Sequence, residues 1–131
     1  MKRIHIVALI AGLAADLIGS IIVSAAVTFV FIAVRGAGQP SQAIIETLET
    51  DPLFLSIGFI IGIAFTLLGA YIVARMSRPH SVLNTLVFGI ISTLLGLFFV
   101  STYPLWYTIL CVLTIIPISL APGYLLADEK V

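Results

Sequence analysis

One acidic residue lies deep inside an apolar stretch and is the side chain best suited to chemistry within a membrane. Asp16 follows Ile4 by 12 residues, which is about 18 Å along a helix axis. An isolated carboxylate is costly at that depth, so we expect Asp16 to be protonated or paired inside the protein. Because no Lys or Arg is expected at the same depth, a protonated acid donating to a hydroxyl or carbonyl is favoured.

Hydroxyl side chains on all the apolar stretches are expected near the depth of Asp16. They are Ser20, Thr66, Ser92, Thr93 and Thr114. With Asp16 they predict an intramembrane polar layer, for which two interpretations stay open. The layer is either a proton or cation site, or a device that fixes helix register or a subunit contact.

Other chemistry-bearing residues form no recognisable site. His5 and His80 are expected near one membrane face, but their neighbours show no metal-ligand spacing. Cys111 is the one cysteine, which excludes a disulfide within the chain and a cysteine metal cluster. Paired intramembrane carboxylates, a His beside a Ser at depth and a phosphate-binding glycine loop are also missing. We therefore predict no catalytic residues, no metal, no cofactor and no enzyme activity.

The chain that carries these residues is strongly apolar. Of its 131 residues, 61% are hydrophobic and 9% are charged, whereas a soluble domain has about 25% charged residues. The composition therefore predicts an integral membrane protein, with the lipid bilayer as its surroundings. Six Lys and Arg against six Asp and Glu leave no basic field for nucleic acid.

Four stretches reach the roughly 20 apolar residues that a bilayer span needs. They are residues 4–34, 53–74, 81–100 and 105–127. Gly36, Gly38 and Pro40 end the first stretch, and residues 41–50 predict a short amphipathic helix at the interface, with Ser41 as its cap. We expect an all-α fold, a bundle of four transmembrane helices that forms a single integral membrane domain over residues 1–131.

An internal repeat is an open alternative within this fold. Residues 9–24 align without a gap with residues 86–101, and Gly12 and Gly19 match Gly89 and Gly96. A duplication would give two tandem helical hairpins.

Small residues at a spacing of four predict how the helices pack. The glycines expected in the contact seams are Gly12, Gly19, Gly58, Gly62, Gly89 and Gly96. In the last stretch, Pro117 predicts a kink.

Basic residues predict the orientation of the bundle. Lys2, Arg3, Arg75, Arg78 and Lys130 fall on one side of the four spans, and Arg35 alone falls on the other. The positive-inside tendency puts that basic edge and both termini in the cytoplasm. Contact of this edge with anionic lipid head groups is also expected.

Two resemblances bear on the chain. Ala15-Asp16-Leu17-Ile18-Gly19 resembles the first helix of the small multidrug resistance transporters, in which Ala-Glu-Val-Ile-Gly carries the coupling carboxylate. The later helices and the long outer loop depart from that family, and the acid is Asp instead of Glu. More broadly, residues 12–20, 67–75 and 80–97 resemble a group of small four-helix bacterial membrane proteins. That second resemblance implies the architecture and a bacterial cytoplasmic membrane, but no activity.

Two functions fit these observations. The favoured hypothesis is a non-enzymatic accessory or scaffold subunit that packs within a larger membrane complex, through other subunits or by self-association. The alternative is a small homo-oligomeric proton-coupled transporter or channel that uses Asp16.

Overall fold

The computed structural model describes residues 3–36, 38, 40–99 and 102–128. In this part of the chain the helices are α1 (Ile6–Arg35), α2 (Ser41–Leu48), α3 (Pro52–Met76), α4 (Ser81–Phe99) and α5 (Leu105–Asp128). All except α2 are long and apolar enough to cross a membrane. The expected all-α, four-helix architecture of an integral membrane protein is thus confirmed.

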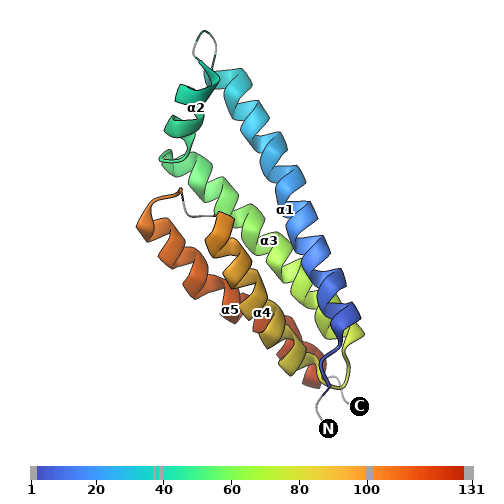
Figure 1. Cartoon of the computed structure of the whole chain (residues 1–131). Helices are drawn as coiled ribbons and strands as arrows, with labels where there is room; N and C mark the ends of the chain where they lie inside the picture. The colour runs from blue at the N-terminus through green and yellow to red at the C-terminus, as the bar shows by residue number, and fades with distance from the viewer. Residues whose placement is uncertain (1–2, 37, 39, 100–101, 129–131) are drawn as a thin grey trace.

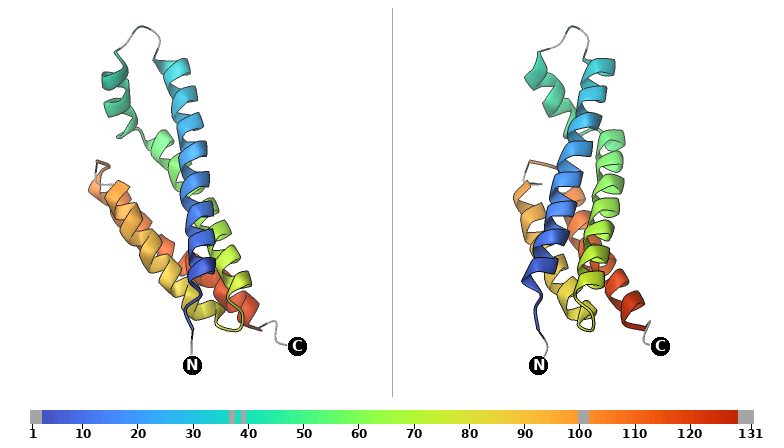
Figure 2. Two further views of the ribbon diagram at one scale, coloured as in Figure 1. Left: turned by 45° about the vertical axis from the view of Figure 1, so that its right-hand side comes forward. Right: turned by 90° about the vertical axis from the view of Figure 1, so that its right-hand side faces the viewer.

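The long helices form two hairpins, α1 with α3 and α4 with α5 (Figure 1). α3 is central because it also contacts both helices of the second hairpin. α1 begins and α5 ends at one end of the bundle, the termini end, and α2 lies at the opposite end, the α2 end (Figure 1). The two hairpins lie close at the termini end and diverge toward the α2 end (Figure 2).

Observed helix ends differ little from the predicted ones. α1 has 30 residues, about 45 Å, and so exceeds the roughly 30 Å of a hydrocarbon core. It ends where the Gly36 N–H donates to the Ile32 carbonyl at 2.8 Å. α4 is described as far as Phe99, and the predicted end at Val100 lies outside the described residues. α5 runs through Pro117 and Pro122 as one helix, and the kink stays a prediction.

The predicted interfacial helix exists as α2, but it is shorter than residues 41–50. It ends at Leu48, and Pro40 occupies the N-cap position that was assigned to Ser41. Ile44 and Leu48 are buried, whereas Ile45 is exposed. Ile44 and Leu48, one turn apart, therefore form the buried face of α2.

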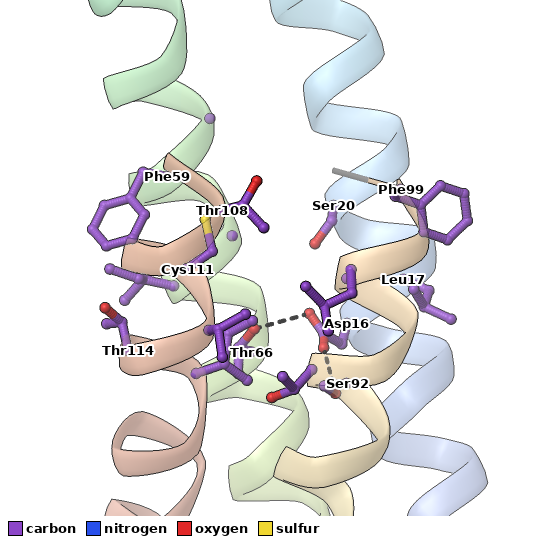
Figure 3. Close-up of a pocket in the computed structure, with 18 of the residues that line it drawn as sticks. Asp16, Leu17, Ser20, Phe59, Thr66, Ser92, Phe99, Thr108, Cys111 and Thr114 are labelled. Atoms are coloured by element: carbon purple, nitrogen blue, oxygen red, sulfur yellow. Dashed lines mark hydrogen bonds between the residues drawn. The ribbon is translucent and has the colours of Figure 1, made fainter. Parts of the chain in front are cut away.

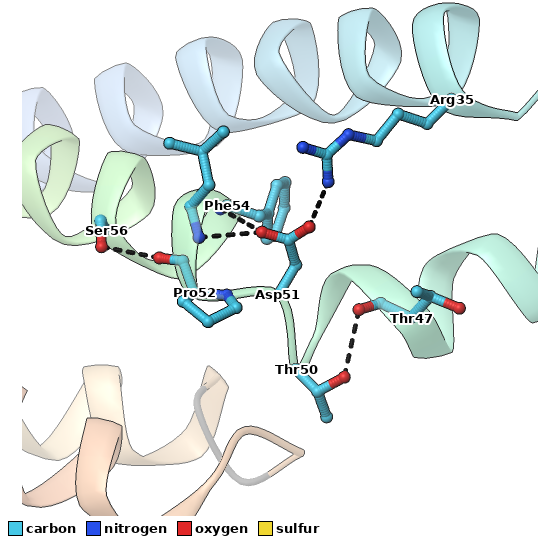
Figure 4. A network of polar contacts seen from close by, with 8 residues as sticks. Arg35, Thr47, Thr50, Asp51, Pro52, Phe54 and Ser56 are labelled. Carbon is cyan, nitrogen blue, oxygen red and sulfur yellow. Dashed lines mark hydrogen bonds and ion pairs between the residues drawn. The ribbon is translucent and has the colours of Figure 1, made fainter.

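Asp51 joins the end of α1 to the start of α3 (Figure 4). Its carboxylate accepts from the backbone N–H groups of Leu53 at 2.8 Å and Phe54 at 3.2 Å, which caps α3. The same carboxylate pairs with Arg35 in the last turn of α1. Arg35 also lies over the ring of Phe31, 5.2 Å from its centre. These contacts fix the α1–α3 hairpin at the α2 end.

The Asp51 contacts predict a pH-dependent contribution to stability. The Phe54 N–H bond is the largest contact that lowers the pKa of Asp51 below 3.8, and the Leu53 N–H and Arg35 act in the same direction. A lowered folded-state pKa stabilises above the ordinary pKa and loses that effect as pH falls through the folded-state value. Thermal unfolding in mild detergent should therefore give a higher Tm for the native protein than for Asp51→Asn at neutral pH. The difference should shrink as pH falls below 3.8 and vanish once pH is below the lowered folded-state pKa; a difference independent of pH would contradict the role of the charge.

Small residues bring the helices close in the half of the bundle toward the termini end. A Cβ atom on Gly12 would lie 2.7 Å from the Gly69 carbonyl oxygen, and one on Gly69 would lie 2.7 Å from the Gly12 carbonyl oxygen. Gly89 faces the side chain of Ser119 at the α4–α5 contact, where a Cβ atom on Gly89 would lie 3.1 Å from the Ser119 Cβ. In each hairpin, a glycine of the suggested repeat thus faces the partner helix; the repeat itself stays a prediction.

The remaining glycines predicted in the contact seams differ in how closely other residues approach them. Gly19 faces the ring of Phe65, and Cβ atoms on Gly58 and Gly96 would make only ordinary contacts, at 3.4 Å and 3.7 Å. A Cβ atom on Gly62 would meet nothing within 4 Å. The prediction that Gly62 packs against another helix is therefore wrong, because the helices have already separated at its level.

Candidate functional site

Asp16 joins three of the long helices (Figure 3). Its side chain is buried in α1. Thr66 of α3 donates to Oδ1 at 3.4 Å, and Ser92 of α4 donates to Oδ2 at 3.1 Å. Both carboxyl oxygens therefore have a hydroxyl partner, and each partner comes from a different helix.

The other predicted polar residues lie near Asp16, and two of them donate to their own helix. Ser20, Thr93 and Thr114 line the same cavity as Asp16. Thr93 donates to the Gly89 carbonyl at 2.7 Å, and Thr114 donates to the Leu110 carbonyl at 2.6 Å, each one turn back on its own helix. The layer is therefore present as a group of neighbours, in which Thr66 and Ser92 donate to the Asp16 carboxyl group.

A cavity of about 290 Å³ lies between the four long helices, with Asp16 at its floor (Figure 3). It extends from Asp16 toward the α2 end, where the hairpins diverge. Its walls are mainly apolar, and the hydroxyls of Ser20, Ser24 and Thr108 are among its polar groups. Of the described residues that line it, Asp16 is the one acidic residue, and no Lys or Arg is among them.

Toward the termini end, the bundle below Asp16 is tightly packed. Val73 and Phe88 are fully buried there, in a cluster with Leu9 and Ala70. The Gly12–Gly69 backbone contact closes the space between α1 and α3 one turn below Asp16. The carboxyl group therefore lies at the boundary between a cavity on one side and a close-packed core on the other.

Tyr107 and two glycines shape the cavity in a way that the sequence patterns did not predict. Tyr107 is buried and lines the cavity, whereas its neighbour Trp106 is exposed. The Tyr107 ring packs edge-on against Phe59, with ring centres 6.4 Å apart. Gly58 and Gly62 line the wall of α3, so their missing side chains add volume to the cavity.

The chain finds no match among known protein families, curated proteins or solved structures. The residues of the cavity are therefore the basis on which its chemistry is inferred.

Asn84 is a buried polar residue that the sequence reasoning missed. It is fully buried in α4. Its Oδ1 accepts from the His5 N–H at 2.8 Å, and its Nδ2 donates to the His80 carbonyl at 2.9 Å and to the Arg3 carbonyl at 3.3 Å. Asn84 thereby ties the start of α1 to α4. A lone amide in an apolar helix was the available signal, because a buried amide must find partners.

The remaining candidates lie apart from the cavity floor. His5 immediately precedes α1 and His80 immediately precedes α4, both at the termini end, and Cys111 lines the cavity wall. In the described part of the chain, no three His, Cys, Asp or Glu side chains are grouped as a metal ion would require. Of the predicted basic edge, Arg3, Arg75 and Arg78 lie at the termini end; Lys2 and Lys130 lie outside the described residues.

Proposed function

We propose that the protein is a small membrane transporter that binds an organic cation in the cavity, with Asp16 as the counter-ion. The observation that carries this proposal is the position of Asp16, the one acidic residue among the described lining residues, at the floor of a largely apolar cavity. Concave apolar sites with a few convergent polar groups are the usual form of small-molecule sites. An ionisable residue within a membrane is also a common mark of a substrate or proton pathway.

The lining of the cavity defines the class of ligand. Aliphatic and aromatic walls favour an apolar body, and a buried carboxylate favours a positive charge that compensates it. Ser92 and Thr66 donate to the two carboxyl oxygens and so hold the group in place at the floor of the cavity. The ligand we propose is therefore a compact lipophilic cation.

One-sided access supports transport in preference to permanent binding. The cavity extends from Asp16 toward the α2 end, while the close-packed cluster with Phe88 separates Asp16 from the termini end. A transporter that alternates its access needs such a state and a second one in which the closed side opens. The local resemblance of residues 15–19 to small multidrug resistance transporters agrees with a coupling role for Asp16.

A pair of isosteric ligands tests the proposed site. Benzyltrimethylammonium and neopentylbenzene have the same shape but differ in charge, so a site built around Asp16 should saturate with the cation and not with the hydrocarbon. Calorimetric titration of the purified protein in lipid nanodiscs measures both. If both ligands saturated the protein, or neither did, the proposal would be contradicted, because simple partitioning into the bilayer needs no carboxylate.

Filling the cavity should abolish binding without disturbing the packed half of the bundle. The site of the Gly62 Cβ has no neighbour within 4 Å, so the side chain in Gly62→Leu should occupy the cavity instead of clashing. We expect benzyltrimethylammonium binding to weaken at least about 10-fold, the equivalent of about 1.4 kcal/mol, with an unchanged Tm. Binding as tight as that of the native protein would show that the ligand lies elsewhere.

An accessory or scaffold subunit is the second candidate, and exposed apolar surface supports it. Phe29 and Val34, in the half of α1 near the α2 end, are 73% and 75% exposed. Another membrane subunit, or a second copy, could cover this surface in place of lipid. Mass determination after mild-detergent extraction distinguishes the candidates: different subunits in fixed stoichiometry favour the accessory role, and a homo-oligomer or monomer favours the transporter.

The proposed orientation puts both termini and the basic edge in the cytoplasm of a bacterial cell. The arginines Arg3, Arg75 and Arg78 at the termini end support it through the positive-inside tendency. In that orientation the cavity extends toward the outer side of the membrane.

A further inference from the structure

A second hollow lies on the outer surface of the bundle, between α3 and α5 near the termini end. This groove has a volume of about 1030 Å³ and shares no lining residue with the Asp16 cavity. Its walls include Leu67 and Leu68 of α3 and Leu125 and Leu126 of α5. Leu68 and Leu125 are 46% and 71% exposed, so in a membrane the groove faces lipid.

One end of the groove is cationic. Arg75 lies in the last turn of α3, and Arg78 lies in the turn that follows; both line the groove. Arg75 donates to the hydroxyl of Tyr71 at 2.8 Å, which holds the guanidinium at the groove. Among the described residues Arg75 forms no ion pair with a carboxylate.

The length of the groove matches one leaflet of a bilayer. Along α3 its lining runs from Ala64 to Arg75, a rise of about 16 Å. Half of a hydrocarbon core is about 15 Å. Leucine walls therefore extend from the membrane interface, where the arginines lie, to about the midplane.

We propose that this groove binds one anionic phospholipid, with its phosphate at Arg75 and Arg78 and an acyl chain between α3 and α5. A guanidinium matches a phosphodiester with two parallel hydrogen bonds. Two cationic side chains at the interface favour a head group with net negative charge over a zwitterionic one. The apolar walls account for the acyl chain, which a free phosphate ion lacks.

Native mass spectrometry of the full chain tests the proposal with phosphatidylglycerol and phosphatidylcholine of identical acyl chains. The native protein should retain one phosphatidylglycerol more tightly than phosphatidylcholine, and inorganic phosphate should not displace it. Each arginine near the surface contributes about 5-fold. The double variant Arg75→Gln/Arg78→Gln should therefore weaken phosphatidylglycerol binding about 30-fold, and Arg75→Gln alone about 5-fold.

Two further variants separate this site from general attraction. Arg3→Gln removes the same charge at the same end but outside the groove, and it should leave the bound lipid in place. Leu68→Trp keeps both arginines while filling the path of the acyl chain, and it should release the lipid. The proposal would be overturned if the native protein retained both lipids equally. It would also be overturned if Arg3→Gln weakened phosphatidylglycerol binding as much as the double variant does, or if Leu68→Trp left that binding unchanged.

Discussion

Asp16→Asn is expected to weaken benzyltrimethylammonium binding at least about 30-fold while the bundle stays folded. The loss follows because removing one member of a buried charge pair costs about 2–5 kcal/mol, and about 2 kcal/mol already corresponds to 30-fold. The asparagine side chain has nearly the same shape, and its amide oxygen can still accept from Thr66 or Ser92, which donate to Asp16 at 3.4 Å and 3.1 Å. Calorimetry in nanodiscs measures the affinity, and thermal unfolding monitors the fold.

Asp51→Asn is the matched control for this experiment. It makes the same chemical change in the same chain, but Asp51 caps α3 at the α2 end and does not line the cavity. We expect it to bind the cation as the native protein does. If Asp16→Asn also kept native affinity, Asp16 would serve packing or assembly, and the accessory-subunit hypothesis would gain. In liposomes, proton-coupled uptake of the cation should likewise disappear in Asp16→Asn and persist in Asp51→Asn.

Hydropathy and turn residues predicted the helices because those signals act locally. A bilayer demands about 20 apolar residues per span, and the stretches predicted at 53–74 and 105–127 became Pro52–Met76 and Leu105–Asp128. The Asp51-Pro52 pair sets the start of α3 through a cap and a proline at the first turn. The partners of Asp16 could also be predicted from the sequence, since counting residues from the helix ends gives the depth of each side chain along the membrane normal.

The cavity was not predictable, because it depends on the angle between two hairpins. A row of small residues at a spacing of four has the same sequence pattern whether it packs against another helix or lines an open space. The row through Gly62 and Thr66 does both: Thr66 is buried against Asp16, and one turn away Gly62 faces the cavity. The burial of Tyr107 was not predictable for a related reason, since an aromatic residue at a helix end can lie toward lipid or toward a space between helices.

Gly69→Ala is expected to have the largest effect on stability, because Gly69 lies where the backbones of α1 and α3 are in contact. A Cβ atom in Gly69→Ala would lie 2.7 Å from the Gly12 carbonyl oxygen, 2.8 Å from Cζ of Phe88 and 3.2 Å from Cβ of Asp16. The carbonyl belongs to a helix backbone and cannot rotate away, so α1 must separate from α3. Overpacking of this kind costs about 1–3 kcal/mol. Reversible unfolding in mixed micelles of increasing denaturing detergent measures the loss.

Gly62→Ala supplies the comparison that isolates the close approach. Both substitutions replace glycine by alanine inside α3, so the gain in helix propensity, about 1 kcal/mol, is common to the two. At Gly62 the new Cβ meets nothing within 4 Å, and the variant should be as stable as the native protein or more so. The difference between the two variants is therefore the cost of separating α1 from α3. Equal stabilities would mean that the helices are not in contact at Gly12 and Gly69 in the membrane. If Gly69→Ala alone loses stability and also binds the cation more weakly, the contact between Gly12 and Gly69 also holds Asp16 at the floor of the cavity.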